Sequence, residues 1–452
     1  MTLNNRITNQ SIEFALHCPV LGQYFQNNLL DDCTNDYETT HLIDLAAKQL
    51  RLPINNSALT ISQTTPLQTI QDCCYTQLKL TFNHLESAVH LLYVTNNKVN
   101  LVELSQSYHP SRRKLNQLAF SYFIAQQLNL HIHNFWIYTI NSAFKLTNKS
   151  TELFIPQNMT RRVKRLVKHI QPAITLLAQQ QNQIKPTLGK PCFKPNRCSQ
   201  FKRCWPMSNQ WDIFNLLHLP LDEKLDQFNT NCQTFNDIKQ SNLQLNSIQK
   251  RQLNAELSQR PQLNIALLTQ CLSLLTDTFQ VLDIEAAQFT APLFTDQAPF
   301  AALPFLYSIH QHDSSTSTTS HKDAYFLPTT DFRREFAQQL INDLNPEQSI
   351  VIFDSTLEKK IFSMLMQRYP DLSHPLMVRQ SLFIDIAPLF NKHHIILPGM
   401  KGKSSMKNII ECIQSSVDFS DLSIQSGNDV VKIYKELIFN KQPTTTAIEN
   451  NL

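Results

Sequence analysis

The first half of the chain alternates between helical and strand-like hydrophobic patterns. Apolar side chains recur at helical spacing between residues 11 and 50, over residues 111–130, and from Met159 onward in a segment rich in Lys and Arg. Four apolar runs predict strands: TQLKLTFNHL (76–85), AVHLLYV (88–94), KVNLVEL (98–104) and HIHNFWIYTIN (131–141). Asn96-Asn97, between the second and third runs, predicts a tight hairpin. This order of elements predicts a small α/β domain.

The second half begins with a polar, helical stretch and then returns to strands. Residues 209–275 carry no strong strand signal. Strands are predicted at FQVLDIE (279–285), LPFLYSIH (303–310), AYFLP (324–328) and SIVIFD (349–354), with helices near 331–344 and 357–368. We therefore expect three segments: an α/β domain (1–206), a helical connector (207–275) and a second α/β domain (276–452).

Composition excludes several classes of protein. Hydrophobic residues make up 42% of the 452 residues. No apolar run approaches the roughly 18 residues of a membrane span, and the N-terminus lacks a signal-peptide pattern. Membrane-spanning, collagen-like, coiled-coil and wholly disordered proteins are excluded. The net charge of +4 is too mild to indicate a polyanionic partner by itself.

Glycine and cysteine depart from ordinary usage. The chain has 5 glycines, where average usage of about 7% would give about 32. We expect the survivors to lie where a side chain is not tolerated; they are Gly22, Gly189, Gly399, Gly402 and Gly427. The 10 cysteines, without a secretion signal, predict a reducing, cytoplasmic setting with free thiols or metal ligands.

Three cysteines share one loop. Cys192, Cys198 and Cys204 are evenly spaced in GKPCFKPNRCSQFKRCWP, where prolines interrupt regular structure. Thiolates favour zinc or an iron–sulfur cluster, and both usually take four ligands. Cys18 is the candidate fourth ligand; the alternative is buried cysteines without metal. That alternative is preferred for the other six: Cys33, Cys73, Cys74, Cys232, Cys271 and Cys412.

One cysteine near the N-terminus and three at the end of an α/β core resemble the RecB-like nucleases with an iron–sulfur clasp, including those of CRISPR adaptation. A closer resemblance, over nearly the whole chain, is to the bacterial family called domain of unknown function 2779. It rests on these segments: HCP (17–19), the three-cysteine run, LDIEAA (282–287), LPFLYSIH (303–310), DFRREFA (331–337), FDSTLEK (353–359), FIDIAPLF (383–390) and GKSSMK (402–407). The resemblance implies a RecB-like PD-(D/E)XK half, then an RNase H-like DEDD exonuclease half with a mixed sheet. It also implies a four-iron–four-sulfur cluster on Cys18, Cys192, Cys198 and Cys204, with zinc as the alternative.

The PD-(D/E)XK pattern is incomplete in this chain. Such a site needs an Asp on one strand, and an acid and a Lys two residues apart on the next, around a divalent metal. Glu103 matches the acid, but Leu92 and Ser105 stand at the Asp and Lys positions. We expect this first site to be degenerate. His90 and His109 are candidate substitutes, although a plain surface role is the more common one for such histidines.

The second site begins with Asp283 and Glu285, whose side chains share one face of a strand. In DEDD-type exonucleases such a pair binds the first of two metals, here Mg²⁺ or Mn²⁺; the alternative is a solvated strand end. Asp354 ends the next strand and Glu358 follows it. The family has an Asn at the position of Asp354 and its acid at that of Glu358, while Asp385 matches a position of structural character.

The last acid of the DEDD set is missing. The resemblance places it after a Gly and a Tyr that match Gly427 and Tyr434, and no such acid follows them before residue 452. Asp429 is the nearby acid, but its spacing does not fit. We therefore expect slow hydrolysis or none.

Basic residues offer candidate contacts to nucleic-acid phosphates. Arg112 and Arg113 open one predicted helix, Arg161 and Arg162 open another, and Lys407 matches a family lysine at a helix start. Solvated helix faces explain them equally well. The sequence thus predicts a nuclease-like protein, descended from a divalent-metal enzyme acting on DNA or RNA and now weak or inactive. The alternatives are a catalytically dead nucleic-acid-binding or scaffold protein, and a truncated gene product.

Overall fold

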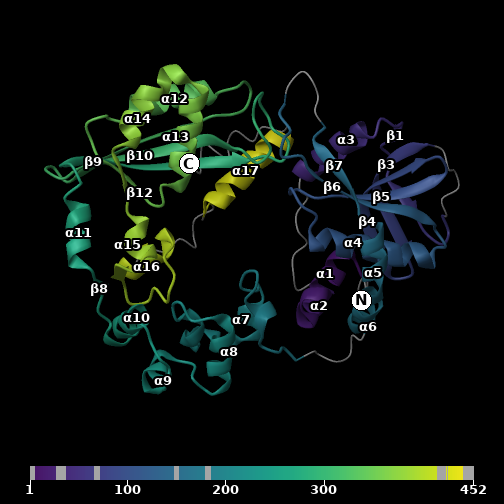
Figure 1. The fold of residues 1–452 in the computed structure, drawn as a ribbon, viewed down its shortest axis with the longest axis horizontal. Helices are drawn as coiled ribbons and strands as arrows, with labels where there is room; N and C mark the ends of the chain where they lie inside the picture. The colour runs from purple at the N-terminus through teal and green to yellow at the C-terminus, as the bar shows by residue number, and fades with distance from the viewer. Residues whose placement is uncertain are drawn as a thin grey trace. The chain divides into compact units, whose positions relative to one another are not determined.

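The chain forms two compact units, each described by itself here (Figure 1). The computed structural model describes residues 6–26, 37–65, 72–146, 152–178, 185–414, 424 and 426–440. Unit 1 contains Met1–Gln200 and Gln288–Ala301, and unit 2 contains Phe201–Ala287 and Ala302–Leu452. The predicted connector therefore lies within unit 2, while residues 288–301 lie in unit 1.

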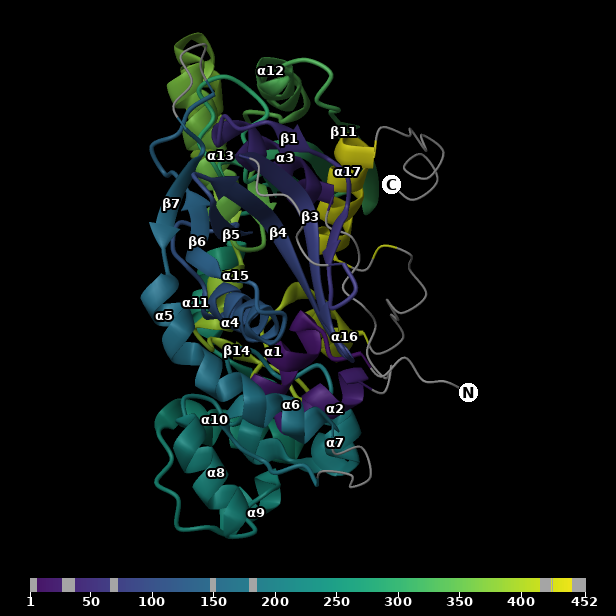
Figure 2. The same cartoon turned by 90° about the vertical axis from the view of Figure 1, so that its right-hand side faces the viewer.

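Unit 1 is built on one mixed sheet. Its seven strands, counted over the described residues, run in the order β1-β3-β4-β5-β6-β7, with β2 also pairing with β3. Their bounds are β1 Ile54–Asn55, β2 Leu59–Ile61, β3 Cys73–Phe82, β4 Leu85–Thr95, β5 Lys98–Leu104, β6 Ile132–Ile140 and β7 Phe154–Asn158. β3, β4 and β5 form an antiparallel meander, visible in Figure 2, and β6 then pairs parallel with β5. The expected α/β architecture is confirmed.

Asparagines make the tight turns of this sheet. Asn96 and Asn97 have φ angles of 50° and 58°, the left-handed pair of a two-residue hairpin, so the predicted hairpin is confirmed. Asn83, with φ 51°, ends β3 one residue before His84. The run TQLKLTFNHL is therefore not one strand, contrary to the prediction. Asparagine is among the residues that tolerate this conformation best, which lets a glycine-poor chain turn tightly.

The helices of unit 1 follow the hydrophobic periodicity. They are α1 Asn9–His17, α2 Pro19–Gln26, α3 Tyr37–Gln49, α4 Arg112–Gln127, α5 Thr160–Leu166 and α6 Ile170–Ala178. Ser111 caps α4 by accepting a hydrogen bond from the Lys114 amide at 3.2 Å. The basic segment predicted as one helix is divided by a 3₁₀ turn, Val167–His169, between α5 and α6.

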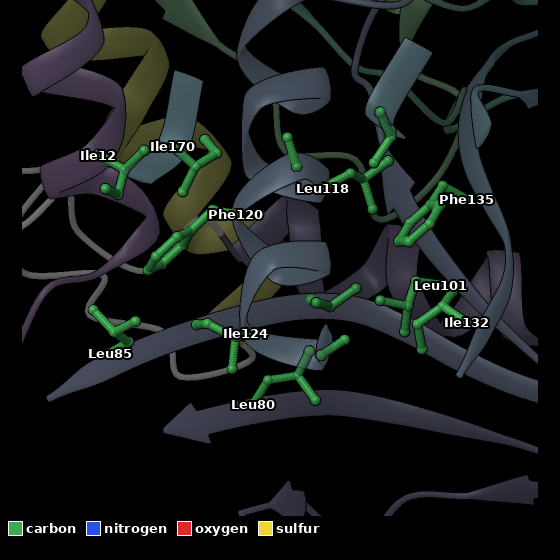
Figure 3. Close-up of a cluster of buried hydrophobic side chains, with 14 of the residues drawn as sticks. Ile12, Leu80, Leu85, Leu101, Leu118, Phe120, Ile124, Ile132, Phe135 and Ile170 are labelled. Carbon is green, nitrogen blue, oxygen red and sulfur yellow. The ribbon is translucent and has the colours of Figure 1, made fainter. Parts of the chain in front are cut away.

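Buried side chains cover both faces of this sheet. On one face, Ile12 of α1, Phe120 and Ile124 of α4 and Ile170 of α6 converge on strand residues such as Leu101 (Figure 3). On the other face, α3 supplies a second cluster with Leu42 and Ala46. Sheet side chains alternate between the two clusters, as the pleat requires.

Unit 2 contains a five-stranded mixed sheet, counted over the described residues, in the order β11-β10-β9-β12-β13. The strands are β9 Thr278–Gln288, β10 Ala302–Asp313, β11 Thr318–Tyr325, β12 Ile350–Ile352 and β13 Phe383–Asp385. β12 runs parallel to both β9 and β13, and β10 and β11 are antiparallel. A separate strand pair joins β8 Gln262–Leu263 to β14 Ile395–Ile396.

The predicted third strand of this unit was misplaced. AYFLP was expected to form it, but β11 spans Thr318–Tyr325 and is polar and exposed along nearly its whole length. An edge strand of this kind carries no apolar alternation for the sequence pattern to detect.

The helices of unit 2 surround its sheets (Figure 1). They are α7 Phe201–Cys204, α8 Leu221–Asn229, α9 Phe235–Gln240, α10 Ser247–Ser258, α11 Ile265–Leu272, α12 Arg333–Asp343, α13 Thr356–Arg368, α14 Ser373–Gln380, α15 Ala387–Asn391, α16 Met406–Ile413 and α17 Gly427–Asn440. Over the described parts of both units, no helix combines the length and apolarity that crossing a membrane requires.

Two of the scarce glycines confirm the prediction about them. A Cβ atom on Gly22 would lie 2.8 Å from Ala15, and one on Gly402 would lie 2.6 Å from the carbonyl oxygen of Asn215. Gly189 does not fit the prediction, because the nearest atom to its added Cβ, on Pro191, would be 3.8 Å away.

Candidate functional site

Asp283 and Glu285 lie on β9, the central strand of the unit 2 sheet. Leu282 and Ile284 alternate with them and are buried, at 2% and 1% exposure, which directs both carboxylates to the opposite face. Burial raises the pKa of Asp283. Burial, and then the negative charge of Asp283, raise the pKa of Glu285 to about 7.

Glu358 reaches the same place from the first turn of α13. Its side chain is only 4% exposed, and its Oε2 atom is buried without a hydrogen-bond partner. Burial raises the pKa of Glu358 to about 7, and the charges of Asp283 and Asp354 add to that effect. Asp283 thus neighbours both Glu285 and Glu358, and its negative charge opposes the ionisation of each; we call these three acids the carboxylate cluster.

Asp354 and Asp385 accept hydrogen bonds that hold the turn before α13. The Asp354 carboxylate accepts a hydrogen bond from the Thr356 hydroxyl at 2.6 Å at the start of α13. The Asp385 carboxylate accepts hydrogen bonds from the Ser355 amide, the Ser355 hydroxyl and the Ala387 amide, at 3.0, 2.8 and 3.0 Å. Burial by itself would raise the pKa of Asp385, but these hydrogen bonds lower it. Asp385 therefore holds the turn that presents Glu358.

The last described helix, α17, packs against the Glu285 carboxylate. A Cβ atom on Gly427, the first residue of α17, would overlap the Glu285 carboxylate. Tyr434 of α17 stacks on Phe305 with ring centroids 3.9 Å apart, and its hydroxyl donates to the carbonyl oxygen of Phe326 at 3.1 Å. Asp429 accepts a hydrogen bond from the Ser426 hydroxyl at 2.8 Å, as a helix-start residue does.

These carboxylates are the oxygen donors that Mg²⁺ or Mn²⁺ would use. Among the described residues, however, no group of three or more His, Cys, Asp or Glu side chains lies close enough together to hold a metal ion. The unpartnered Glu358 Oε2 is a donor atom that a cation or a proton would satisfy.

Glu103 in unit 1 is fully engaged with neighbouring cations. Its carboxylate lies 3.0 Å from Lys114 Nζ and 2.9 Å from His90 Nδ1, and the residue is 2% exposed. Burial would raise the pKa of Glu103, but His90 and Lys114 together lower it to about 2. Leu92 is fully buried in the core and Ser105 bonds to the Ser107 hydroxyl, so neither supplies a metal ligand.

Sequence reasoning missed this pair of partners. A plain surface role is the more common one for a histidine such as His90, and no motif of the sequence singles out Lys114. The structure instead places both on Glu103, because β4, β5 and the start of α4 meet there. A buried acid near a Lys at a helix start was the available signal.

Three of the four predicted clasp cysteines lie in unit 1. Burial raises the pKa of the Cys198 thiol, and the charges of Cys18 and Cys192 raise it further, although the described cysteines do not form a group of three that could hold a metal ion. His17 Nε2 lies 3.2 Å from the carbonyl oxygen of Pro191, which joins the end of α1 to the cysteine loop. Cys204 ends α7 in unit 2. Of the cysteines expected to be buried, Cys74 and Cys232 are, while Cys33 lies outside the described residues.

The predicted phosphate contacts are mostly surface residues. Arg112, Arg161 and Arg162 are exposed, and Arg113 forms an ion pair with Glu13 at 2.8 Å. Lys407 is the exposed second residue of α16, whose cap is Ser405. Trp205 and Trp211 pack together with ring centroids 5.7 Å apart.

Comparison with known proteins gives one match. Residues 280–405 match the family described as Domain of unknown function (DUF2779). This stretch includes Asp283, Glu285, Asp354 and Glu358, and it supports the resemblance seen in the sequence motifs. No curated protein and no solved structure matches the chain.

Proposed function

We propose that this chain is a nuclease-like protein whose unit 2 carries a divalent-metal centre of reduced competence. Asp283, Glu285 and Glu358 would bind Mg²⁺ or Mn²⁺ weakly and support slow or no hydrolysis of DNA or RNA. The observations that support the proposal are the raised pKa values of Glu285 and Glu358, which both lie near Asp283, and the buried Glu358 Oε2 atom without a hydrogen-bond partner. Carboxylates held beside a core usually have a cation or a proton as partner.

Topology supports an RNase H-like assignment for unit 2. The antiparallel pair β10–β11 lies on one side of β9, and β12 and β13 lie parallel on the other. The acids stand on the central strand of this order. For unit 1 we propose a RecB-like origin, which the β3–β4–β5 meander followed by the α4 crossover to β6 supports.

Chemistry at the centre depends on protonation. A bound Mg²⁺ or Mn²⁺ would polarise a phosphoryl group and lower the pKa of a coordinated water. Glu285 and Glu358 have pKa values near 7, and both must lose their protons before a cation binds.

The clasp belongs to the same proposal. Cys18, Cys192, Cys198 and Cys204 would hold a four-iron–four-sulfur cluster or zinc, as in the family that the motifs resemble. The proximity of three of these thiols in unit 1 supports this. The reducing environment such thiols need is that of the bacterial cytoplasm.

A second candidate function is nucleic-acid binding without cleavage. The contacts of Glu103 with Lys114 and His90 favour it, since they occupy the acid that matches the PD-(D/E)XK pattern. The exposed arginines Arg112, Arg161 and Arg162 would contact phosphates.

Metal titration and cleavage assays on the full chain test both functions. Calorimetric titration with Mn²⁺ at pH 8 should show weak binding that Asp283→Asn and Glu358→Gln remove. Asp323→Asn, which changes an exposed carboxylate on β11, should leave it intact. End-labelled single- and double-stranded DNA and RNA should then be cut slowly with Mn²⁺ or not at all. Tight nucleic-acid binding with no Mn²⁺ signal would favour the second function.

A further inference from the structure

Two histidines of unit 2, distant in sequence, bring their ring nitrogens together. His218 follows the 3₁₀ helix Asp212–Asn215, and His393 lies two residues beyond the end of α15. Their Nε2 atoms are 3.0 Å apart, and the rings meet edge to face with centroids 5.0 Å apart. Neither residue belongs to the carboxylate cluster.

Helix α10 fixes the His218 loop from its buried face. Gln252, 1% exposed, accepts a hydrogen bond from the Leu217 amide at 2.9 Å, and Gln249, 4% exposed, donates to the Leu217 carbonyl at 2.8 Å. His218 itself adopts a left-handed backbone with φ 54°. The imidazole is thus presented by a loop held on both sides of its peptide chain.

The same helix holds the other loop. Arg251 of α10 donates to the carbonyl oxygen of His394 at 3.3 Å, and the following residues form β14 against β8. His393 also has a left-handed backbone, with φ 59°. Left-handed residues other than glycine cost free energy and persist where the surrounding structure over-determines them. Both rings are therefore preorganised by one helix.

We propose that His218 and His393 bind one transition-metal dication of the Zn²⁺, Ni²⁺ or Cu²⁺ class. Metal–imidazole bonds are about 2.0–2.1 Å long, so two ligand nitrogens lie about 2.9 Å apart at the right angle of a square-planar or octahedral ion and about 3.3 Å apart at a tetrahedral Zn²⁺. The observed Nε2–Nε2 distance of 3.0 Å falls within this range and is nearest to the right-angle value. Imidazole is a preferred ligand for these ions.

The remaining coordination positions fall to water or to an external ligand, because the described residues offer no third His, Cys, Asp or Glu at this point. The Arg251 guanidinium near His393 opposes a bound cation and keeps the affinity modest. The ion would join the loop after residue 215 to the loop before β14. This site is independent of the proposed nuclease centre.

Site-resolved histidine labelling tests the inference. Full-length protein at pH 7.5 is treated with diethyl pyrocarbonate with and without one equivalent of Zn²⁺, and modified histidines are mapped by mass spectrometry. Zn²⁺ should protect His218 and His393 together and leave exposed His374 unchanged. Asparagine tolerates the left-handed backbone of position 218, so His218→Asn should keep the loop conformation. In this variant the protection of His393 by Zn²⁺ should vanish. In the control His374→Asn it should remain.

Equal labelling of both rings with and without Zn²⁺ would overturn the proposal and leave a hydrogen bond between two imidazoles. Protection of His393 that survives His218→Asn would overturn it as well, because the ion would then be elsewhere.

Discussion

The Glu285 carboxylate and Gly427 share one corner of unit 2 so closely that a Cβ atom on residue 427 would overlap both carboxylate oxygens. Glu285 lies on the central strand β9, and Gly427 begins α17, the last described helix. Since Tyr434 anchors α17 against Phe305, the helix cannot simply move away. Any side chain at position 427 would therefore force the Glu285 carboxylate to move.

Gly427→Ala should destabilise unit 2 by about 1 kcal/mol, because the added methyl group forces the flexible Glu285 carboxylate to shift. Urea unfolding of both proteins measures the difference. Gly189→Ala is the matched control, since its added Cβ would meet nothing nearer than Pro191 at 3.8 Å. Equal stability of the two variants would contradict the contact.

Glu358→Gln should stabilise the protein at pH 8 and change little at pH 4.5. Burial raises the pKa of Glu358 from 4.5 to about 7, so the folded protein holds a proton that the unfolded chain has released. The free energy of unfolding therefore falls as pH rises from about 4.5 to about 7, by on the order of 2 kcal/mol for this group. Because Gln cannot ionise, the variant lacks this fall in the free energy of unfolding.

Urea unfolding across this pH range measures the Glu358 effect as the difference between wild type and variant. Glu347→Gln, on an exposed loop, provides the control and should follow wild type at every pH. A constant difference between Glu358→Gln and wild type would show that the carboxyl is ionised throughout.

Lys114→Met should destabilise unit 1 by about 3 kcal/mol, because it leaves the buried Glu103 carboxylate with His90 as its remaining cationic partner. Exposed Arg112→Met should stay within about 0.5 kcal/mol of wild type. Acid titration gives a second measurement. The pKa of Glu103 is lowered to about 2, so its contribution is complete above pH 4.5 and is lost as pH falls towards 2.

Glu103→Gln also tests the reading of unit 1 as inert. Any Mn²⁺-dependent cleavage by the full chain should be unchanged in this variant, provided that circular dichroism shows a native fold. Loss of cleavage in a folded Glu103→Gln protein would mean that unit 1 contains the active centre.

Local patterns predicted most of the strands and helices, since hydrophobic periodicity and turn residues act over a few positions. The Asn96-Asn97 hairpin is an example, and both of its residues adopt the left-handed angles that the turn needs. The polar strand β11 escaped prediction because its pairing with β10, not its own sequence, makes it a strand.

In the candidate site too, local sequence predicted some features, while others depend on tertiary packing. Asp283 and Glu285 share a strand face by geometry alone, so sequence sufficed for them. The ion pair of Glu103 with Lys114 depends on how β5 and α4 pack, and the overlap of Gly427 with Glu285 depends on where α17 docks. Such contacts arise from tertiary packing, which no local pattern records.

Metal analysis of anaerobically purified protein tests the cysteine clasp. Cys18, Cys192 and Cys198 are neighbours in unit 1, and burial followed by their mutual repulsion raises the pKa of Cys198. A bound metal would favour the thiolates and offset that cost, so wild type should carry zinc, or iron with sulfide. Cys198→Ser should lose the metal, whereas Cys271→Ser, on α11 of unit 2, should keep it.

The metal would close the long chain segment between Cys18 and Cys192, so Cys198→Ser should also unfold at a lower temperature. A wild type free of both iron and zinc, or a Cys198→Ser protein with the full metal content, would rule out the clasp.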